Sequence, residues 1–268
     1  MRIIHHIGMS YGQVRKDFQD AGVKLQIDDN ALARIATCDV AENDPRWGKV
    51  QPLIKKYQLV DIPFTEFTDS ELLSANYLSM GATWHHGYPQ PEDDFGYRNT
   101  SYDLAEYCEH CGIGAMQTAP FRMKKAPNWG RRSILQMNWV FDEFFVKPDL
   151  WKAIFEPLGI KCRPVLLHRT GQELDSVVQL DIPHLVPLIM DSKAYAFERC
   201  EFCDRKKYKH VTGFFPTPQA TDFLFFKSAE YFGSGASAHR AVVISSALYL
   251  KIRDASLRGA EFYACAIP

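Results

Sequence analysis

The chain has 268 residues, 46% of them hydrophobic and 24% charged, so it has enough apolar side chains for the core of one large domain or two smaller ones. Its formal net charge of −1 gives no general attraction to nucleic acid or to an anionic membrane surface. No apolar run is long enough to span a bilayer, and residues 1–10 do not resemble a signal peptide. We therefore expect a cytoplasmic protein with neither a membrane nor nucleic acid as its partner.

The first part of the chain alternates between strand and helix patterns. Residues 1–8 and 59–67 are rich in β-branched and aromatic residues, which predicts two strands. Residues 30–36 and 47–57 are predicted helices, and in the second of these apolar residues recur at helical spacing. We interpret residues 1–75 as an N-terminal α/β segment.

The rest of the chain, residues 76–268, is predicted to be mostly β-structure. One helix is expected at 148–159, because Pro148 opens it and Gly159 closes it. Six other segments have strand composition. They are 134–146, 163–168, 176–182, 194–200, 209–215 and 222–232.

The C-terminal part has a different pattern. Residues 237–259 are predicted to form one long amphipathic helix, with Ser237 as its N-cap and Gly259 as its stop, and a strand over 260–267 follows. The predicted fold class is therefore α+β, with a mixed, largely antiparallel sheet, flanking helices and a four-cysteine element like a zinc ribbon. The α/β segment and the β-rich region can also form one integrated domain.

Two CxxC pairs are the strongest chemical signal. Cys108 and Cys111 lie in "YCEHCGIG", and Cys200 and Cys203 lie in "RCEFCDRKKY". Thiols stay reduced in the cytoplasm, and the total of seven cysteines is odd, so a metal site or a catalytic pair is favoured over disulfides. The other three cysteines, at positions 38, 162 and 265, are expected to be small buried hydrophobes.

Four cysteines in two tight turns can surround one zinc ion. Gly112 directly follows the first pair, where such a turn favours a positive φ. The long separation of the pairs costs little, because loop-closure entropy grows slowly with length. Four thiolates leave no coordination position for water, so we expect structural zinc held by Cys108, Cys111, Cys200 and Cys203. Iron in place of zinc, a redox pair and cysteines without a ligand remain open alternatives.

Two further segments are candidate enzyme sites. The loop 82–103 carries adjacent histidines and acidic residues, and the turn 233–239 has the G-x-G-x-x-A spacing of a dinucleotide loop. Too little chain follows that turn to build a dinucleotide-binding fold. Asp142 and Glu143 are adjacent in a predicted strand, so we expect them to face opposite sides of the sheet and not to act as a pair.

The "CEHCG … CEFC" combination resembles the bacterial double-CXXCG motif family, which includes immunity proteins of the swarming-inhibition and polymorphic-toxin type. Residues 125–159 and the C-terminal 239–265 also resemble that family, whereas Asp204 stands where the motif has its second glycine. The resemblance implies a non-enzymatic protein that neutralises a cognate toxin by binding it.

A zinc-stabilised binding protein is therefore the predicted function, and an enzyme with its site near 82–103 or 233–239 is the alternative. The loop 82–103 is the predicted interface, because it combines aromatic anchors with acidic residues that suit a basic partner. The expected partner-binding residues are Trp84, Tyr88, Glu92, Asp93 and Asp94.

Overall fold

The structure is a computed structural model that describes residues 1–10, 12–28, 35–191 and 195–267. The fold is α+β with mixed, largely antiparallel sheets, as the sequence predicts. The chain forms two compact units: Met1–Glu71 with Thr212–Phe214, and Leu72–Val211 with Phe215–Pro268. None of the helices in the described parts of the chain has both the length and the apolar character needed to cross a membrane.

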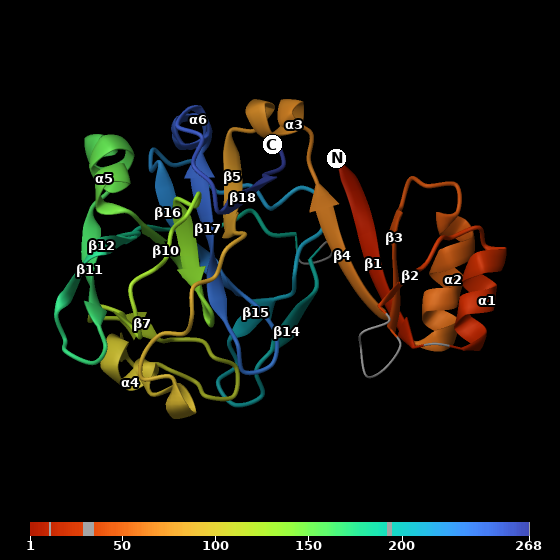
Figure 1. The fold of residues 1–268 in the computed structure, drawn as a ribbon, viewed down its shortest axis with the longest axis horizontal. Helices are drawn as coiled ribbons and strands as arrows, with labels where there is room; N and C mark the ends of the chain where they lie inside the picture. Colours follow the sequence, from red (N-terminus) through yellow and green to blue (C-terminus); the bar gives the residue numbers. More distant parts are fainter. Residues whose placement is uncertain (11, 29–34, 192–194, 268) are drawn as a thin grey trace. The chain divides into compact units, whose positions relative to one another are not determined.

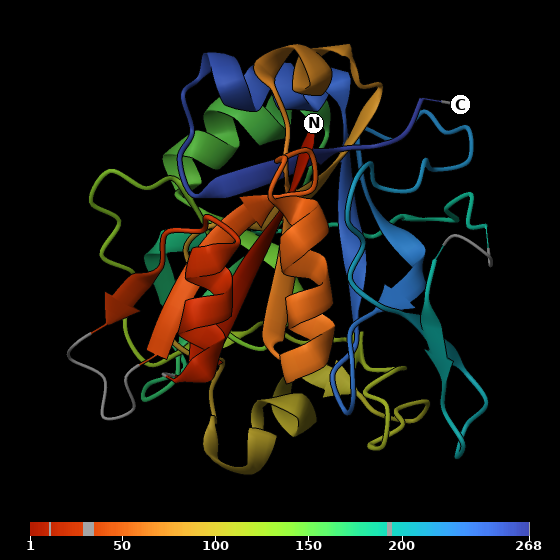
Figure 2. The ribbon, with the colours of Figure 1, turned by 90° about the vertical axis from the view of Figure 1, so that its right-hand side faces the viewer.

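The first unit is a four-stranded antiparallel sheet with two helices on one face (Figures 1 and 2). The strand order β2-β3-β1-β4, with a helix before β2 and another before β4, is that of a split βαβ motif. The elements are β1 (Arg2–Ser10), α1 (Gln13–Asp20), β2 (Gln26–Asp28), β3 (Ile35–Ala41), α2 (Trp47–Tyr57) and β4 (Val60–Glu66).

Alternate residues of the central strands build the core of this unit. Ile7 and Met9 of β1 and Cys38 of β3 are buried with Phe18 of α1 and Val50 of α2, because successive side chains of a strand face opposite sides. The predicted strands 1–8 and 59–67 and the helix 47–57 are confirmed. The predicted helix 30–36 lies mostly outside the described residues, and its last two residues belong to β3.

The second unit contains two larger sheets. One has the order β8-β11-β12-β10-β9, and the other has β14-β15-β16-β17-β5-β18 with β13 paired to β16. Strand β10 of the first sheet packs against β17 of the second. The strands are β5 (Tyr77–Ala82), β8 (Arg122–Met123), β9 (Ile134–Met137), β10 (Val140–Val146), β11 (Cys162–Leu167), β12 (Glu173–Leu180), β13 (Leu185–Val186), β14 (Phe197–Arg199), β15 (Lys206–Tyr208), β16 (Phe225–Phe232), β17 (His239–Ser245) and β18 (Ala260–Ala264).

Helical segments lie at both ends of these sheets. Helices α5 (Pro148–Leu150) and α6 (Ser246–Asp254) lie at one end and α4 (Tyr97–Ser101) at the other (Figures 1 and 2). A two-stranded ribbon is separate from both large sheets. The remaining elements are α3 (Asp69–Ser74), where the two units divide, the 3-10 turn Asp93–Phe95, α4 (Tyr97–Ser101), the ribbon of β6 (Tyr102–Asp103) and β7 (Met116–Gln117), and α6 (Ser246–Asp254).

The predicted helix 148–159 is a composite of three helical types. It begins as α5 (Pro148–Leu150), continues as a π turn over Trp151–Phe155 and ends as a 3-10 turn over Glu156–Leu158. Proline within this stretch removes a backbone donor, which favours such irregularity, and Gly159 ends it with φ 76°.

The predicted strand 209–215 is wrong. The strand β15 ends at Tyr208, and Thr212–Phe214 belong to the first unit, where the Gly213 N–H donates to the Thr65 hydroxyl at 2.7 Å. The other five predicted strand segments of this region contain strands, although Ala194 lies outside the described residues.

The long C-terminal helix is also wrong in its first part. Residues 239–245 form β17, which pairs with both β16 and β5, and only Ser246–Asp254 is helical. The N-cap is therefore Ser245, whose hydroxyl accepts from the Leu248 N–H at 3.3 Å. A run of buried apolar residues is compatible with a central strand as well as with a helix. Residues 239–245 form a strand because β16 and β5 pair with them on both sides.

The position of this cap gives a stability test. Replacing Ser245 by Ala leaves the first turn of α6 without its acceptor and should lower the free energy of unfolding by about 1 kcal/mol. The matched control is Ser237→Ala, because Ser237 is exposed and caps no helix. Urea unfolding followed by circular dichroism measures the free energy of unfolding of both variants. An equal loss of stability in the two variants would contradict the assignment of Ser245 as the N-cap.

Candidate metal centre

The four predicted cysteines come together in the second unit. All four Sγ atoms lie within 4.8 Å of one another, with Cys108 and Cys200 at 3.9 Å and Cys111 and Cys203 at 3.6 Å. Cys108 and Cys111 are buried, whereas Cys200 and Cys203 are partly exposed. The two CxxC pairs are therefore two halves of one cluster, although 88 residues lie between Cys111 and Cys200 (200 − 111 − 1 = 88).

The sulfur positions fit a tetrahedral metal. Zinc–thiolate bonds of about 2.3 Å place the four sulfurs of a tetrahedron roughly 3.8 Å apart. The two short Sγ···Sγ distances of 3.9 and 3.6 Å match that edge. The site is thus able to hold one metal ion through four thiolates, which is the ligand set of a closed structural zinc site.

Both turns have the same backbone hydrogen bonds. In the first, the Gly112 N–H donates to the Cys108 carbonyl at 2.7 Å, and the Cys108 N–H donates to the Ile113 carbonyl at 2.9 Å. In the second, the Asp204 N–H donates to the Cys200 carbonyl at 2.9 Å, and the Cys200 N–H donates to the Arg205 carbonyl at 3.0 Å.

This repetition explains why the second pair lacks a glycine. Gly112 has φ 78° and Asp204 has φ 60°, so both residues adopt the left-handed conformation that closes the turn. Aspartate tolerates this conformation better than most residues. Glycine is required only at the first turn, where a Cβ on Gly112 would lie 2.5 Å from the Ala236 carbonyl oxygen.

The glycine turn 233–239 packs against the metal site. It joins β16 to β17 as an antiparallel connection, so the helix that a dinucleotide loop requires does not follow it. The buried ammonium of Lys207 donates to the carbonyls of Cys111 at 2.9 Å, Gly235 at 2.6 Å and Ser237 at 3.0 Å. Lys207 therefore fastens this turn to the first cysteine pair.

The guanidinium of Arg205 contacts the cluster directly. Its Nε donates to Cys203 Sγ at 3.4 Å, and this hydrogen bond lowers the pKa of the Cys203 thiol to about 6. Burial raises the pKa of the Cys111 thiol to about 12. A metal ion binds thiolates, so near neutral pH its binding must displace the proton of Cys111, whereas Cys203 is already largely deprotonated.

Sequence reasoning did not identify Lys207 or Arg205. Both lie in "CDRKKY", directly after the second pair, and the only available signal was this basic run beside the cysteines. The middle residues of the two pairs also interact, because the rings of His110 and Phe202 stack at 3.5 Å.

The residues proposed as partner contacts are divided between interior and surface. Trp84 packs edge-on against Trp129 at 5.3 Å beside a buried cluster. Glu92 accepts from Gln90 at 3.0 Å, and this hydrogen bond lowers the pKa of its carboxyl group. Tyr88, Asp93 and Asp94 are exposed.

The exposed Tyr88 belongs to an aromatic cluster of three residues. The ring of Trp139, at the tip of the β9–β10 hairpin, lies 4.4 Å from Tyr88 and 4.6 Å from Phe95. The exposed fractions are 38% for Trp139 and 41% for each of the other two. Tyr88, Phe95 and Trp139 are called the aromatic cluster below.

Metal content is the first test of this centre. We expect purified protein to contain about one zinc ion per chain, as four converging thiolates require. Cys203→Ser should lose the metal and lower the thermal unfolding midpoint, because metal-binding free energy contributes to folding. Elemental analysis and calorimetry measure the two effects. Cys162→Ser is the control, since that thiol is partly exposed and lies outside the cluster.

The two turns should respond differently to substitution. Gly112→Ala should weaken metal retention against a chelator, because its Cβ cannot fit beside the Ala236 carbonyl. Asp204→Gly should retain the metal, since glycine adopts φ 60° without strain. Equal metal loss in the two variants would contradict this account of the turns.

Comparisons with known proteins add no relative of this chain. Protein-family models gave no match. Curated proteins and solved structures gave none either.

Proposed function

We propose that this chain is a zinc-stabilised binding protein, and that it acts as an immunity protein by covering a basic surface of a cognate toxin. The observation that carries the proposal is the aromatic cluster, in which three large rings lie at the surface and two of them belong to residues with an unfavourable backbone conformation. The resemblance of the chain to the double-CXXCG family also supports a role in toxin binding.

The metal has a structural role in this proposal. Four thiolates complete the coordination of zinc and leave no position for a substrate or an activated water. The ion joins the segment that follows β6 to the segment between β14 and β15, so it stabilises the unit that carries the aromatic cluster.

Backbone strain supports a binding role for the cluster. Phe95 has φ 54° and Trp139 has φ 68°, and bulky side chains rarely adopt such values. Conformations of this kind cost of order 1–3 kcal/mol each and are concentrated at functional sites. The two strained residues contact each other, and rigid aromatic residues are the side chains that most often dominate binding interfaces.

The charges beside the cluster favour a basic partner. Asp93 and Asp94 are exposed and directly precede Phe95. The guanidinium of Arg98 stacks on the Phe95 ring at 4.4 Å, so part of the ring surface of Phe95 is covered within the protein. Exposed carboxylates around an aromatic centre complement a partner surface that has lysine or arginine beside apolar side chains.

The test measures binding of a purified partner. A pull-down from the source organism, with the zinc-loaded chain as bait, identifies the partner, which is then purified for titration. Trp139→Gly should weaken binding by about 30-fold or more, as loss of a central aromatic residue does. Its thermal unfolding midpoint should stay near that of the wild type, because glycine relieves the positive φ.

Phe223→Ala is the matched control, since Phe223 is 42% exposed and lies outside both the aromatic cluster and the metal centre. It should leave the affinity unchanged. A partner that binds Trp139→Gly as tightly as the wild type would exclude the cluster as the interface. Turnover of a small molecule with no protein partner would favour an enzyme instead.

A further inference from the structure

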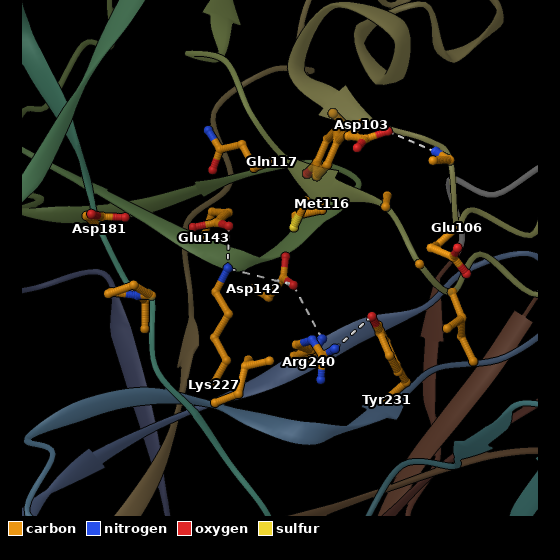
Figure 3. Close-up of a pocket in the computed structure, with 18 of the residues that line it drawn as sticks. Asp103, Glu106, Met116, Gln117, Asp142, Glu143, Asp181, Lys227, Tyr231 and Arg240 are labelled. Carbon is orange, nitrogen blue, oxygen red and sulfur yellow. Dashed lines mark hydrogen bonds and ion pairs between the residues drawn. The ribbon is translucent and has the colours of Figure 1, made fainter.

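A second candidate site lies beside the metal centre and is separate from the aromatic cluster. A cavity of about 640 Å³ lies where β10 of one large sheet faces β16 and β17 of the other. Figure 3 shows charged side chains from several elements that converge there, among them Asp142, Glu143, Lys227 and Arg240. A volume of this size is typical of small-ligand sites.

A β-bulge brings two adjacent carboxylates into this cavity, which corrects the prediction that they face opposite sides. The pairing of β10 with β9 shifts register between Val140 and Phe145. A bulge of this kind re-aims the side chains that it contains. Glu143 Oε1 accepts from Lys227 Nζ, and Asp142 Oδ2 lies 4.0 Å from the same nitrogen.

The cations that line the cavity already have partners within the protein. Lys227 is paired with Glu143, which also accepts from Gln179 at 3.0 Å. Arg240 donates to the Ser228 carbonyl at 2.9 Å and to the Tyr231 hydroxyl at 2.8 Å, and it stacks on the tyrosine ring.

The other two cations are occupied in the same way. Arg163 donates to Asp181 at 2.8 Å, and Arg205 donates to the Glu106 carbonyl at 2.7 Å as well as to a cysteine sulfur. None of the four cations is therefore free to neutralise an anionic ligand without giving up an internal partner.

Asp142 is a carboxylate of this cavity with unused acceptor capacity. Among the described residues, its Oδ2 has only the contact with Lys227 and a long hydrogen bond of 3.4 Å from the Arg240 N–H, and its Oδ1 accepts no hydrogen bond. Its side chain is 23% exposed, so a ligand can reach it. A carboxylate can accept several hydrogen bonds, most strongly from a charged donor.

Apolar side chains line the same cavity and remain accessible. Met116 is 61% exposed and Leu185 is 51% exposed, and both contribute to its wall. We propose that this cavity binds a cationic group on a short aliphatic stem, an alkylguanidinium or alkylammonium, with the Asp142 carboxylate as its acceptor. The stem packs against the apolar wall while the charged group reaches Asp142, as long basic side chains do in proteins. This site is independent of the proposed toxin-binding surface.

The test uses three ligands of similar shape and different charge. Zinc-loaded protein is titrated calorimetrically with butylguanidinium, neutral butylurea and anionic butyrate, each up to about 20 mM, a range suited to fragments of this size. We expect saturable binding of butylguanidinium alone. Asp142→Asn should weaken it about tenfold or more, because a charge-assisted hydrogen bond is lost. Asp175→Asn, at an exposed position outside the cavity, should leave it unchanged.

A second variant tests the site without changing Asp142. Met116→Lys supplies a tethered ammonium at the cavity wall, so it should compete with butylguanidinium and weaken its binding about tenfold. Met116→Leu is the matched control and should bind like the wild type. This pair remains informative if Asp142→Asn does not fold.

The source of the cationic group is distinguished by a fourth ligand, Nα-acetyl-arginine methylamide. Binding at least as tight as that of butylguanidinium would indicate an arginine side chain of a protein, and much weaker binding would indicate a free small amine or guanidine. Both outcomes support a cation site. Equal binding of butylurea, preference for butyrate, unchanged affinity in both Asp142→Asn and Met116→Lys, or no binding of butylguanidinium would overturn the proposal.

Discussion

The constraint on which the second unit depends is the convergence of four thiol groups at one point. Four thiolates repel one another strongly, and a divalent metal ion neutralises only two of their four charges. The remaining negative charge favours the nearby guanidinium of Arg205, which donates to Cys203. The ammonium of Lys207 donates to the Cys111 carbonyl, and its charge is paired with Glu198 at 3.2 Å. Second-shell donors of this kind orient metal ligands as much as they balance charge.

Lys207 also connects the metal site to the large sheet. It is 1% exposed and belongs to β15, and its three donors reach carbonyl groups of the first cysteine pair and of the β16–β17 turn. A buried ammonium without acceptors is strongly destabilising. The first cysteine pair, the β16–β17 turn and β15 are therefore held in one arrangement, so the cysteine cluster and the sheet order one another.

The sequence was informative where chemistry is local, and less informative where distant pairing decides. The spacing of Cys108–Cys111 and Cys200–Cys203 sufficed to predict their cluster, because few functions need two such pairs. Residues 239–245 were assigned to a helix, since nothing in their composition reveals that β5 and β16 flank them. Alternation along a regular strand places Asp142 and Glu143 on opposite faces. The prediction is wrong because the register of β10 shifts between Val140 and Phe145, and strict alternation holds only without a bulge.

The position of β5 in its sheet has a consequence for how the protein is made. Its two neighbours, β17 and β18, both lie far downstream in the chain. At synthesis rates of about 5–20 residues per second, β5 leaves the ribosome on the order of ten seconds before either neighbour is available. During that interval both of its edges are open to other nascent strands.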